Sequence, residues 1–203
     1  MEVRVNEEQG APEEIVNWLR APYEYFSAKH GGEGVTLLDC ACGNRAQNDI
    51  LRSRFESVMG VDIEEGSKDA DPTQPFTHLD TNEPLPFNDN TFDVAFSFET
   101  IEHLKPENHV RFIKELLRVT KGAVVVGTVS TDGPNYLNSH VIFKNSLGNN
   151  PYHLKEYSSW EFAELFACLD ANMYHSYLKE GSKFGIKPGL NGPLGVSNFA
   201  EIK

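Results

Sequence analysis

The stretch LLDCACGNRA (residues 37–46) decides the fold, because it joins a buried strand to a tight turn. The residues before it extend the strand to VTLLDC (35–40), an almost wholly apolar run typical of a parallel strand covered on both faces. Such turns usually carry several glycines, which supply positive φ or let a ligand approach the backbone. Here Gly43 is flanked at alternate positions by Ala41 and Arg45, and we expect an ordinary φ at Ala41.

Outward from this stretch, strand-like and helix-like segments alternate along the chain. Apolar residues at helical spacing, together with helix-start signals, indicate helices, and Pro22 is expected to break or kink the first of them. We expect helices over residues 12–30, 46–55, 106–120 and 158–170, and strands over residues 35–40, 57–63, 77–80, 91–98, 122–130, 171–179 and 197–203. A glycine- and proline-rich loop (181–195) is expected before the last strand. This order predicts a single α/β domain (1–203), doubly wound around a mostly parallel, seven-stranded sheet.

Composition and charge limit the classes of partner. The formal net charge is −12, and the longest basic cluster is the loose set Lys179, Lys183 and Lys187. That set is too small to neutralise several phosphates, so no nucleic-acid partner is expected. No apolar run approaches the roughly 18 residues of a membrane span, so no membrane partner is expected. Three cysteines and an acidic N-terminus without a secretory signal predict a reducing, cytoplasmic location.

Three aspartates stand where the first three predicted strands end: Asp39, Asp62 and Asp80. In parallel sheets, ligands bind at the carboxyl ends of the strands. An acidic residue at the second strand's tip, about 20 residues after the first turn, is the usual acceptor for ribose hydroxyls. Asp80 is placed to accept from an exocyclic adenine amine. The three carboxylates together predict an adenosine site, whereas a single one would be an ordinary turn-former.

Four motifs in order resemble those of class I S-adenosylmethionine-dependent methyltransferases, in the branch with a type 11-like domain. They are LLDCACGNRA (37–46), VMGVDIEE (58–65), HLDTNEPLPFNDNTFDVAFSFETIEHL (78–104) and LLRVTKGAVVVGTVS (116–130). The resemblance implies a Rossmann-like fold with an antiparallel last strand, methyltransferase activity and S-adenosyl-L-methionine as cofactor. It covers about residues 35–130, the expected cofactor-binding core.

The resemblance also assigns roles to individual residues. The turn Ala41–Cys42–Gly43 would pass beside the methionine part of the cofactor, and Asp39 closes the strand before it. Asp62 would hold the ribose with Ile63 against the adenine, and Asp80 and Thr81 would read the adenine edge. Phe98 and Glu99 would wall the sulfonium end. These assignments make up the predicted cofactor site.

Arg45 and the C-x-C pair have two interpretations each. Arg45 falls at a helix start, where it could grip the cofactor carboxylate, or it could be a solvent-facing residue chosen for helix propensity. Cys40 and Cys42 suggest a metal site, but no second pair or nearby histidine follows at zinc-site spacing. We therefore interpret them as small apolar residues at a strand end and assign no metal.

The segment ETIEHL (99–104) supplies the candidates for catalysis. Methyl transfer from a sulfonium mainly needs alignment of donor and acceptor, and a general base helps a hydroxyl acceptor. His103 is the first choice for that base because histidine titrates near neutral pH, and His153 is the second. The segment also resembles the metal-binding motif of RNA 3′-end 2′-O-methyltransferases, in which Glu99, Glu102 and His103 would be completed by His140 or His153.

The acceptor is expected to bind in the region after the fifth strand. The polar, glycine-rich residues 131–157 predict an acceptor-binding or lid insertion, and residues 12–30 an N-terminal helical segment. They favour methylation of oxygen or nitrogen on a small polar acceptor, such as a sugar or nucleotide-sugar. The alternatives are a metal-assisted 2′-O-methyltransferase of RNA ends, which the charge of −12 disfavours, and a non-catalytic cofactor-binding protein. A homodimer is one way to complete a site on so short a chain.

Overall fold

One mixed sheet organises the computed structural model, which describes residues 13–65, 72–132, 152–179, 184–190 and 197–203. Over these residues the sheet has eight strands in the order β3-β2-β1-β4-β5-β8-β6-β7. The strands are β1 (Thr36–Cys40), β2 (Ser57–Asp62), β3 (Phe76–His78), β4 (Val94–Phe98), β5 (Val124–Val129), β6 (Ala171–Leu178), β7 (Phe184–Pro188) and β8 (Ser197–Ile202). Strands β3, β2, β1, β4 and β5 pair in parallel, which confirms the doubly wound α/β fold.

The last strand, β8, lies between β5 and β6 and pairs antiparallel with both, as expected. The expected count of seven strands was wrong, because β7 forms inside the predicted loop 181–195. Its residues carry a glycine and a proline and show no alternation of apolar and polar side chains. The strand exists because it pairs antiparallel with the neighbouring β6 over five residue pairs.

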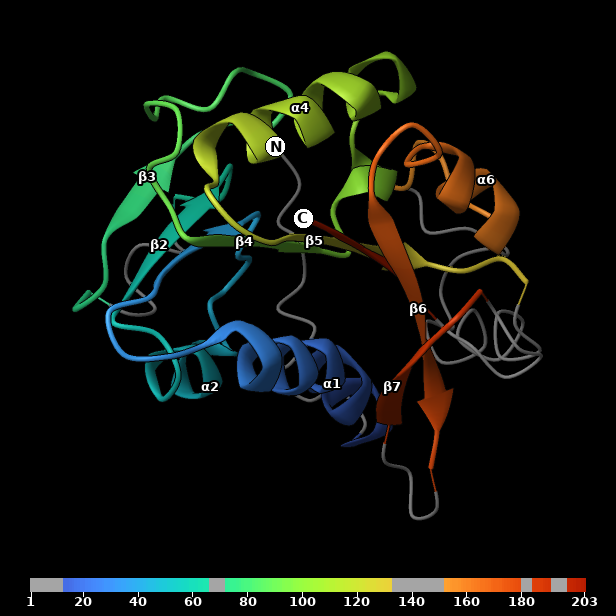
Figure 1. Cartoon of the computed structure of the whole chain (residues 1–203), viewed down its shortest axis with the longest axis horizontal. Coiled ribbons are helices and arrows are strands. Elements are labelled where there is room, and N and C mark those ends of the chain that lie inside the picture. Colours follow the sequence, from blue (N-terminus) through green and yellow to red (C-terminus); the bar gives the residue numbers. More distant parts are fainter. Residues whose placement is uncertain (1–12, 66–71, 133–151, 180–183, 191–196) are drawn as a thin grey trace.

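Helices cover both faces of the sheet (Figure 1). Helices α1 (Glu13–His30) and α2 (Asn48–Arg52) lie on one face, and α4 (His109–Val119) and α6 (Ser159–Glu164) lie on the other. Two short 3₁₀ helices, η1 (Ile101–His103) and η2 (Pro106–Asn108), follow β4. Pro22 lies inside α1 without ending it, so the expected break was wrong. The neighbouring Tyr23 and the fully buried Phe26 pack against the sheet, which holds the helix across the proline.

The strand order reverses direction at β1. The chain runs from β1 outward through β2 to β3, then returns to β4 on the other side of β1. The carboxyl ends of all these strands meet at one edge of the sheet, and the reversal leaves a crevice there between the connections that diverge. The ends of β1, β2 and β4 are therefore where a ligand site is expected.

A buried polar cluster joins α1 to the sheet. The carboxylate of Glu201 on β8 is fully buried and accepts hydrogen bonds from Lys29 Nζ at 2.6 Å and from the Tyr174 hydroxyl at 2.7 Å. His30 Nε2 lies 2.7 Å from its other oxygen. The charge of Lys29 and the hydrogen bonds hold the pKa of Glu201 below its usual value despite burial.

We predict that Lys29→Met lowers the free energy of unfolding by about 3 kcal/mol, because it leaves a buried carboxylate without its main countercharge. Chemical denaturation measured by circular dichroism checks this. The matched control is Lys114→Met on the exposed face of α4, which should change stability by less than about 0.5 kcal/mol. Equal effects of the two substitutions would contradict the prediction.

Candidate cofactor and acceptor site

The turn after β1 is built from left-handed residues at alternate positions. Ala41 has φ 65°, Gly43 φ 54° and Arg45 φ 59°. The expectation of an ordinary φ at Ala41 was therefore wrong. The reason is that the amides of Ala41 and Cys42 both donate to the carbonyl of Val61, at 2.7 and 3.0 Å, which folds the turn against the end of β2.

Asp62 fixes this turn from the second strand. Its carboxylate accepts from the amide of Gly43 at 2.8 Å through one oxygen, and from the amide of Glu64 at 2.8 Å through the other. The side chain is almost fully buried. Each oxygen keeps a further lone pair, so Asp62 can hold the turn and still accept hydrogen bonds from a ligand.

Arg45 is buried, so its interpretation as a solvent-facing residue was wrong. Its guanidinium is buried and donates to the carbonyls of Gln74 and Pro75, at 3.4 and 3.0 Å, and it lies over the ring of Phe76. It packs so close to Gly60 that a β-carbon there would lie 3.0 Å from the guanidinium. The side chain thus ties the turn to the residues that lead into β3.

A pocket opens at the carboxyl ends of the strands, beside this turn. Nine residues line it: Ala41, Asp62, Ile63, Asp80, Thr81, Asn82, Thr100, His103 and Leu104. The structure therefore brings together five of the eleven predicted cofactor residues and one predicted catalytic histidine. Ile63 is 48% exposed and offers an apolar surface between the two aspartates, as an adenine ring requires.

Asp80 shapes the far side of the pocket. One of its oxygens accepts from both the backbone amide and the side-chain amide of Asn82, at 2.8 and 3.0 Å. This is the local turn expected of an aspartate, and it leaves the other oxygen available to the pocket. Asn82, Thr100 and Leu104 also line the pocket but were not predicted. No signal in the sequence separates them from ordinary loop residues, since their position depends on how η1 folds back.

The other predicted cofactor residues surround the pocket without lining it. Asp39 is buried behind the turn, where the Tyr23 hydroxyl donates to it at 3.3 Å, and burial raises its pKa to about 7. Cys42 and Gly43 contribute the turn backbone. Phe98 packs edge-to-face against Tyr23 in the core on the α1 face, and so lies beneath the pocket.

Glu99 links this region to the last strand. It has φ 51°, and its carboxylate accepts from the Ser197 hydroxyl at 3.0 Å. Ser197 in turn accepts from the indole of Trp18 at 3.0 Å. A left-handed residue that is not glycine is strained, and such residues collect at functional sites. The carboxyl end of β4 is thus held between α1 and β8.

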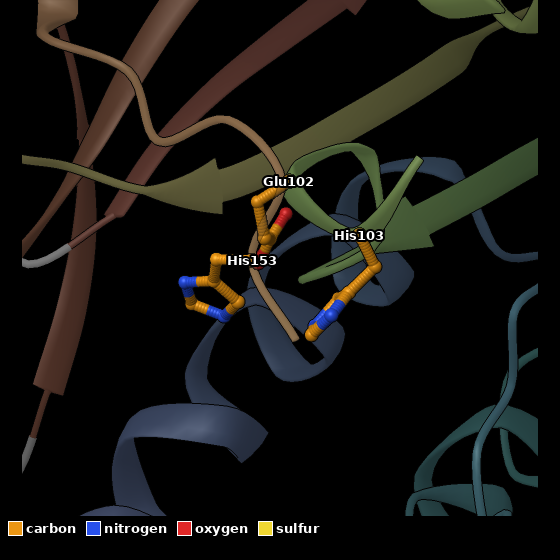
Figure 2. A group of neighbouring side chains, drawn as sticks. All are labelled: Glu102, His103 and His153. Atoms are coloured by element: carbon orange, nitrogen blue, oxygen red, sulfur yellow. The ribbon is translucent and has the colours of Figure 1, made fainter. Parts of the chain in front are cut away.

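Glu102, His103 and His153 form a cluster at the acceptor end (Figure 2). One ligand atom from each lies within 4.8 Å of the other two, although about 50 residues separate the histidines in the chain. The carbonyl of Glu102 accepts from the amides of Leu154 and Lys155, which brings the later segment alongside η1. Both predicted catalytic histidines therefore lie together, whereas His140 lies outside the described residues.

The two motif cysteines differ from Cys168 in exposure. Cys40 and Cys42 are buried, and burial with the charges of Asp39 and Asp62 raises the pKa of both thiols far above neutral. Cys168 is exposed and follows α6. The two motif thiols are therefore uncharged at neutral pH.

Comparisons with known proteins agree with this geometry. Residues 38–126 match a family model described as a methyltransferase domain. Over these residues the chain is similar to methyltransferase domains. A relative is described as S-adenosylmethionine-dependent, and the two aspartates and the exposed isoleucine of the pocket suit an adenosine-containing cofactor.

Proteins similar to this chain occur in a bacterium and in an archaeon. The chain is 28% identical over 162 residues to a protein of Mycolicibacterium smegmatis described as a probable S-adenosylmethionine-dependent methyltransferase, covering 77% of this chain and 59% of that protein. Two solved S-adenosylmethionine-dependent methyltransferases share the fold. The Archaeoglobus fulgidus protein has a TM-score of 0.72 at 14% identity (97% and 96% of the chains), and the Thermotoga maritima protein 0.68 at 18% (93% and 91%).

No helix within the described ranges has the length and apolar character needed to cross a membrane.

We predict that Ala41→Gly raises the free energy of unfolding of the protein by about 0.5–1 kcal/mol. Glycine adopts the left-handed conformation without the cost that alanine incurs, and part of the gain is offset by the freedom of glycine in the unfolded chain. Ala123→Gly, just before β5 and not left-handed, is the control and should destabilise. Denaturant titration distinguishes them, and a loss of stability in both variants would refute the left-handed turn.

The thiols give a second prediction. In the native protein only Cys168 should react with an aromatic disulfide reagent at neutral pH, because the other two thiols are buried and protonated. All three should react after unfolding in guanidinium chloride. The variant Cys168→Ser should show no fast-reacting thiol, and rapid labelling of a second cysteine in that variant would contradict the burial of Cys40 and Cys42.

Proposed function

We propose that this protein transfers a methyl group from S-adenosyl-L-methionine to an oxygen or nitrogen of a small polar acceptor. The single observation that carries the proposal is the pocket in which Asp62, Ile63 and Asp80 converge beside the turn after β1. Two carboxylates on either side of an exposed apolar side chain match the donors and the flat face of an adenosine. The cofactor would supply a methyl group already activated by the positive charge of its sulfonium.

The residues of the chain have three tasks in this reaction. Asp62 and Asp80 would bind the ribose hydroxyls and the adenine amine, and Ile63 would pack on the ring. The left-handed turn at Ala41 lets the backbone approach the cofactor closely. Because the donor is already activated, alignment of the acceptor and exclusion of water are the main contributions left to the protein.

The acceptor is proposed to bind next to His103, which belongs both to the pocket wall and to the cluster with Glu102 and His153. A hydroxyl or protonated amine must lose a proton as the methyl group arrives. The cluster provides titratable groups at this place, and it supports an acceptor that is polar. The formal charge of −12 supports a small acceptor over a polynucleotide.

Calorimetric titration with S-adenosylmethionine and with its demethylated product tests the cofactor site. We expect micromolar binding of both, and we expect Asp62→Ala to weaken it by about 1–3 kcal/mol through loss of hydrogen bonds to a charged acceptor. The control is Asp170→Ala, an exposed carboxylate outside the pocket. Because Asp62 also holds the turn, thermal unfolding of each variant should be measured alongside. Unchanged affinity in the folded Asp62→Ala variant would remove the basis of the proposal.

Turnover separates an enzyme from a cofactor-binding protein. Release of the demethylated product should depend on an added acceptor from a panel of sugars, nucleotide-sugars and small amines. Cofactor binding without product formation on any acceptor would favour the non-catalytic alternative.

A further inference from the structure

The cluster of Glu102, His103 and His153 has features that catalysis by a single histidine base does not require. Glu102 comes from η1 and is fully buried. Its Oε2 accepts from the Thr128 hydroxyl at 2.8 Å, its Oε1 accepts from no donor among the described residues, and the carboxyl group of Glu99 lies within hydrogen-bond range of the Glu102 carboxyl group. Figure 2 shows this carboxylate directed toward the gap between the two imidazole rings. A buried carboxylate oxygen without a partner is costly, so one aimed into a cluster of ligating groups points to an occupant.

Both histidines are held by their Nδ1 atoms. His153 Nδ1 lies 2.6 Å from a carboxylate oxygen of Glu156, and His103 Nδ1 lies 3.1 Å from the carbonyl of Tyr152. Because a carbonyl or carboxylate oxygen can only accept, each Nδ1 donates in these contacts. In the neutral tautomer that donates from Nδ1, the lone pair lies on Nε2. A carboxylate or carbonyl on the far nitrogen is the usual outer partner of a histidine that ligates a metal.

The frame around the cluster is rigid. The backbone bonds from Leu154 and Lys155 to the Glu102 carbonyl hold the two segments together. Tyr157, a few residues further on, is hydrogen-bonded through its hydroxyl to the buried His109 of α4. Thr128 comes from the neighbouring strand β5. Such a frame keeps ligating groups from two distant parts of the chain in place before any ion arrives.

From this geometry we propose that Glu102, His103 and His153 bind a divalent first-row transition cation such as Mn²⁺ or Zn²⁺. Two imidazoles and one carboxylate are a ligand set for these ions, whereas Mg²⁺ prefers oxygen ligands alone. Ligand atoms around such an ion lie about 3–3.6 Å from one another. The ligand atoms of the cluster now lie within 4.8 Å of one another, so they would move about 1 Å closer on binding. The carboxylates of Glu102 and Glu156 would balance its two charges.

Three protein ligands leave coordination positions open, and here they would face the pocket that His103 lines. The role of the cation in methyl transfer rests on the proposed function. The binding of the cation does not depend on that function. A bound cation lowers the pKa of a hydroxyl acceptor, which releases its proton to solvent. The acceptor oxygen then forms a bond to the methyl carbon, and the carbon–sulfur bond breaks with its electron pair left on sulfur. In this arrangement the histidines act as ligands and not as bases.

The test is calorimetric titration of the cofactor-free full chain, stripped of metal with a chelator, with MnCl₂, ZnCl₂ and MgCl₂. We expect one Mn²⁺ or Zn²⁺ per chain and at least tenfold weaker binding of Mg²⁺. Glu102→Gln and His153→Ala should abolish this site, and Glu156→Ala should weaken it about tenfold by releasing His153. The visible spectrum of a Co²⁺ complex should report the histidine ligands in the native protein and be lost in His153→Ala.

The controls exclude other sites and unfolding. Cys168→Ser and His78→Ala remove exposed ligating groups elsewhere and should leave the stoichiometry unchanged. Without metal, Glu102→Gln should be at least as thermally stable as the native chain, because it removes a buried charge. The absence of saturable binding, or binding that persists in both folded variants Glu102→Gln and His153→Ala, would overturn the proposal. Binding of S-adenosylmethionine by Glu102→Gln reports separately on the proposed function.

Discussion

The site depends on how the chain leaves β1. Two consecutive amides at the turn donate to the single carbonyl of Val61, and the amide of Gly43 donates to Asp62. These three bonds force Ala41 into the left-handed region that its side chain disfavours. The same bonds join the carboxyl ends of β1 and β2. The pocket-lining residues Ala41, Asp62 and Ile63 are positioned by this junction.

A second set of backbone hydrogen bonds positions the cluster of Glu102, His103 and His153. The segment that carries His153 returns to η1 through two amides that share the carbonyl of Glu102, so the cluster is assembled by backbone bonds as well as by its side chains. A buried hydrogen bond between the Tyr157 hydroxyl and His109 also fixes this segment to α4. The pocket and the cluster of Glu102, His103 and His153 meet at His103, which belongs to both.

Much of this could be predicted from the sequence. Apolar runs placed β1 and β2 within one residue and β4 within three, and aspartates at strand ends identified the pocket, because both signals are local. Other features could not be predicted because distant residues decide them. The conformation of Ala41 depends on a carbonyl 20 residues later, and the burial of Arg45 depends on two carbonyls before β3. The strand β7 exists only beside β6, and the approach of the His153 segment to η1 rests on backbone bonds to Glu102.

The buried Arg45 makes two positions of the motif interdependent. A glycine at position 45 would relieve the left-handed strain, but it would leave the carbonyl of Gln74 without this donor and a void over Gly60. A side chain at position 60, in turn, would need the space that the guanidinium and the Cys42 sulfur occupy. Neither substitution is neutral alone, so the effect of a change at either position depends on which residue stands at the other.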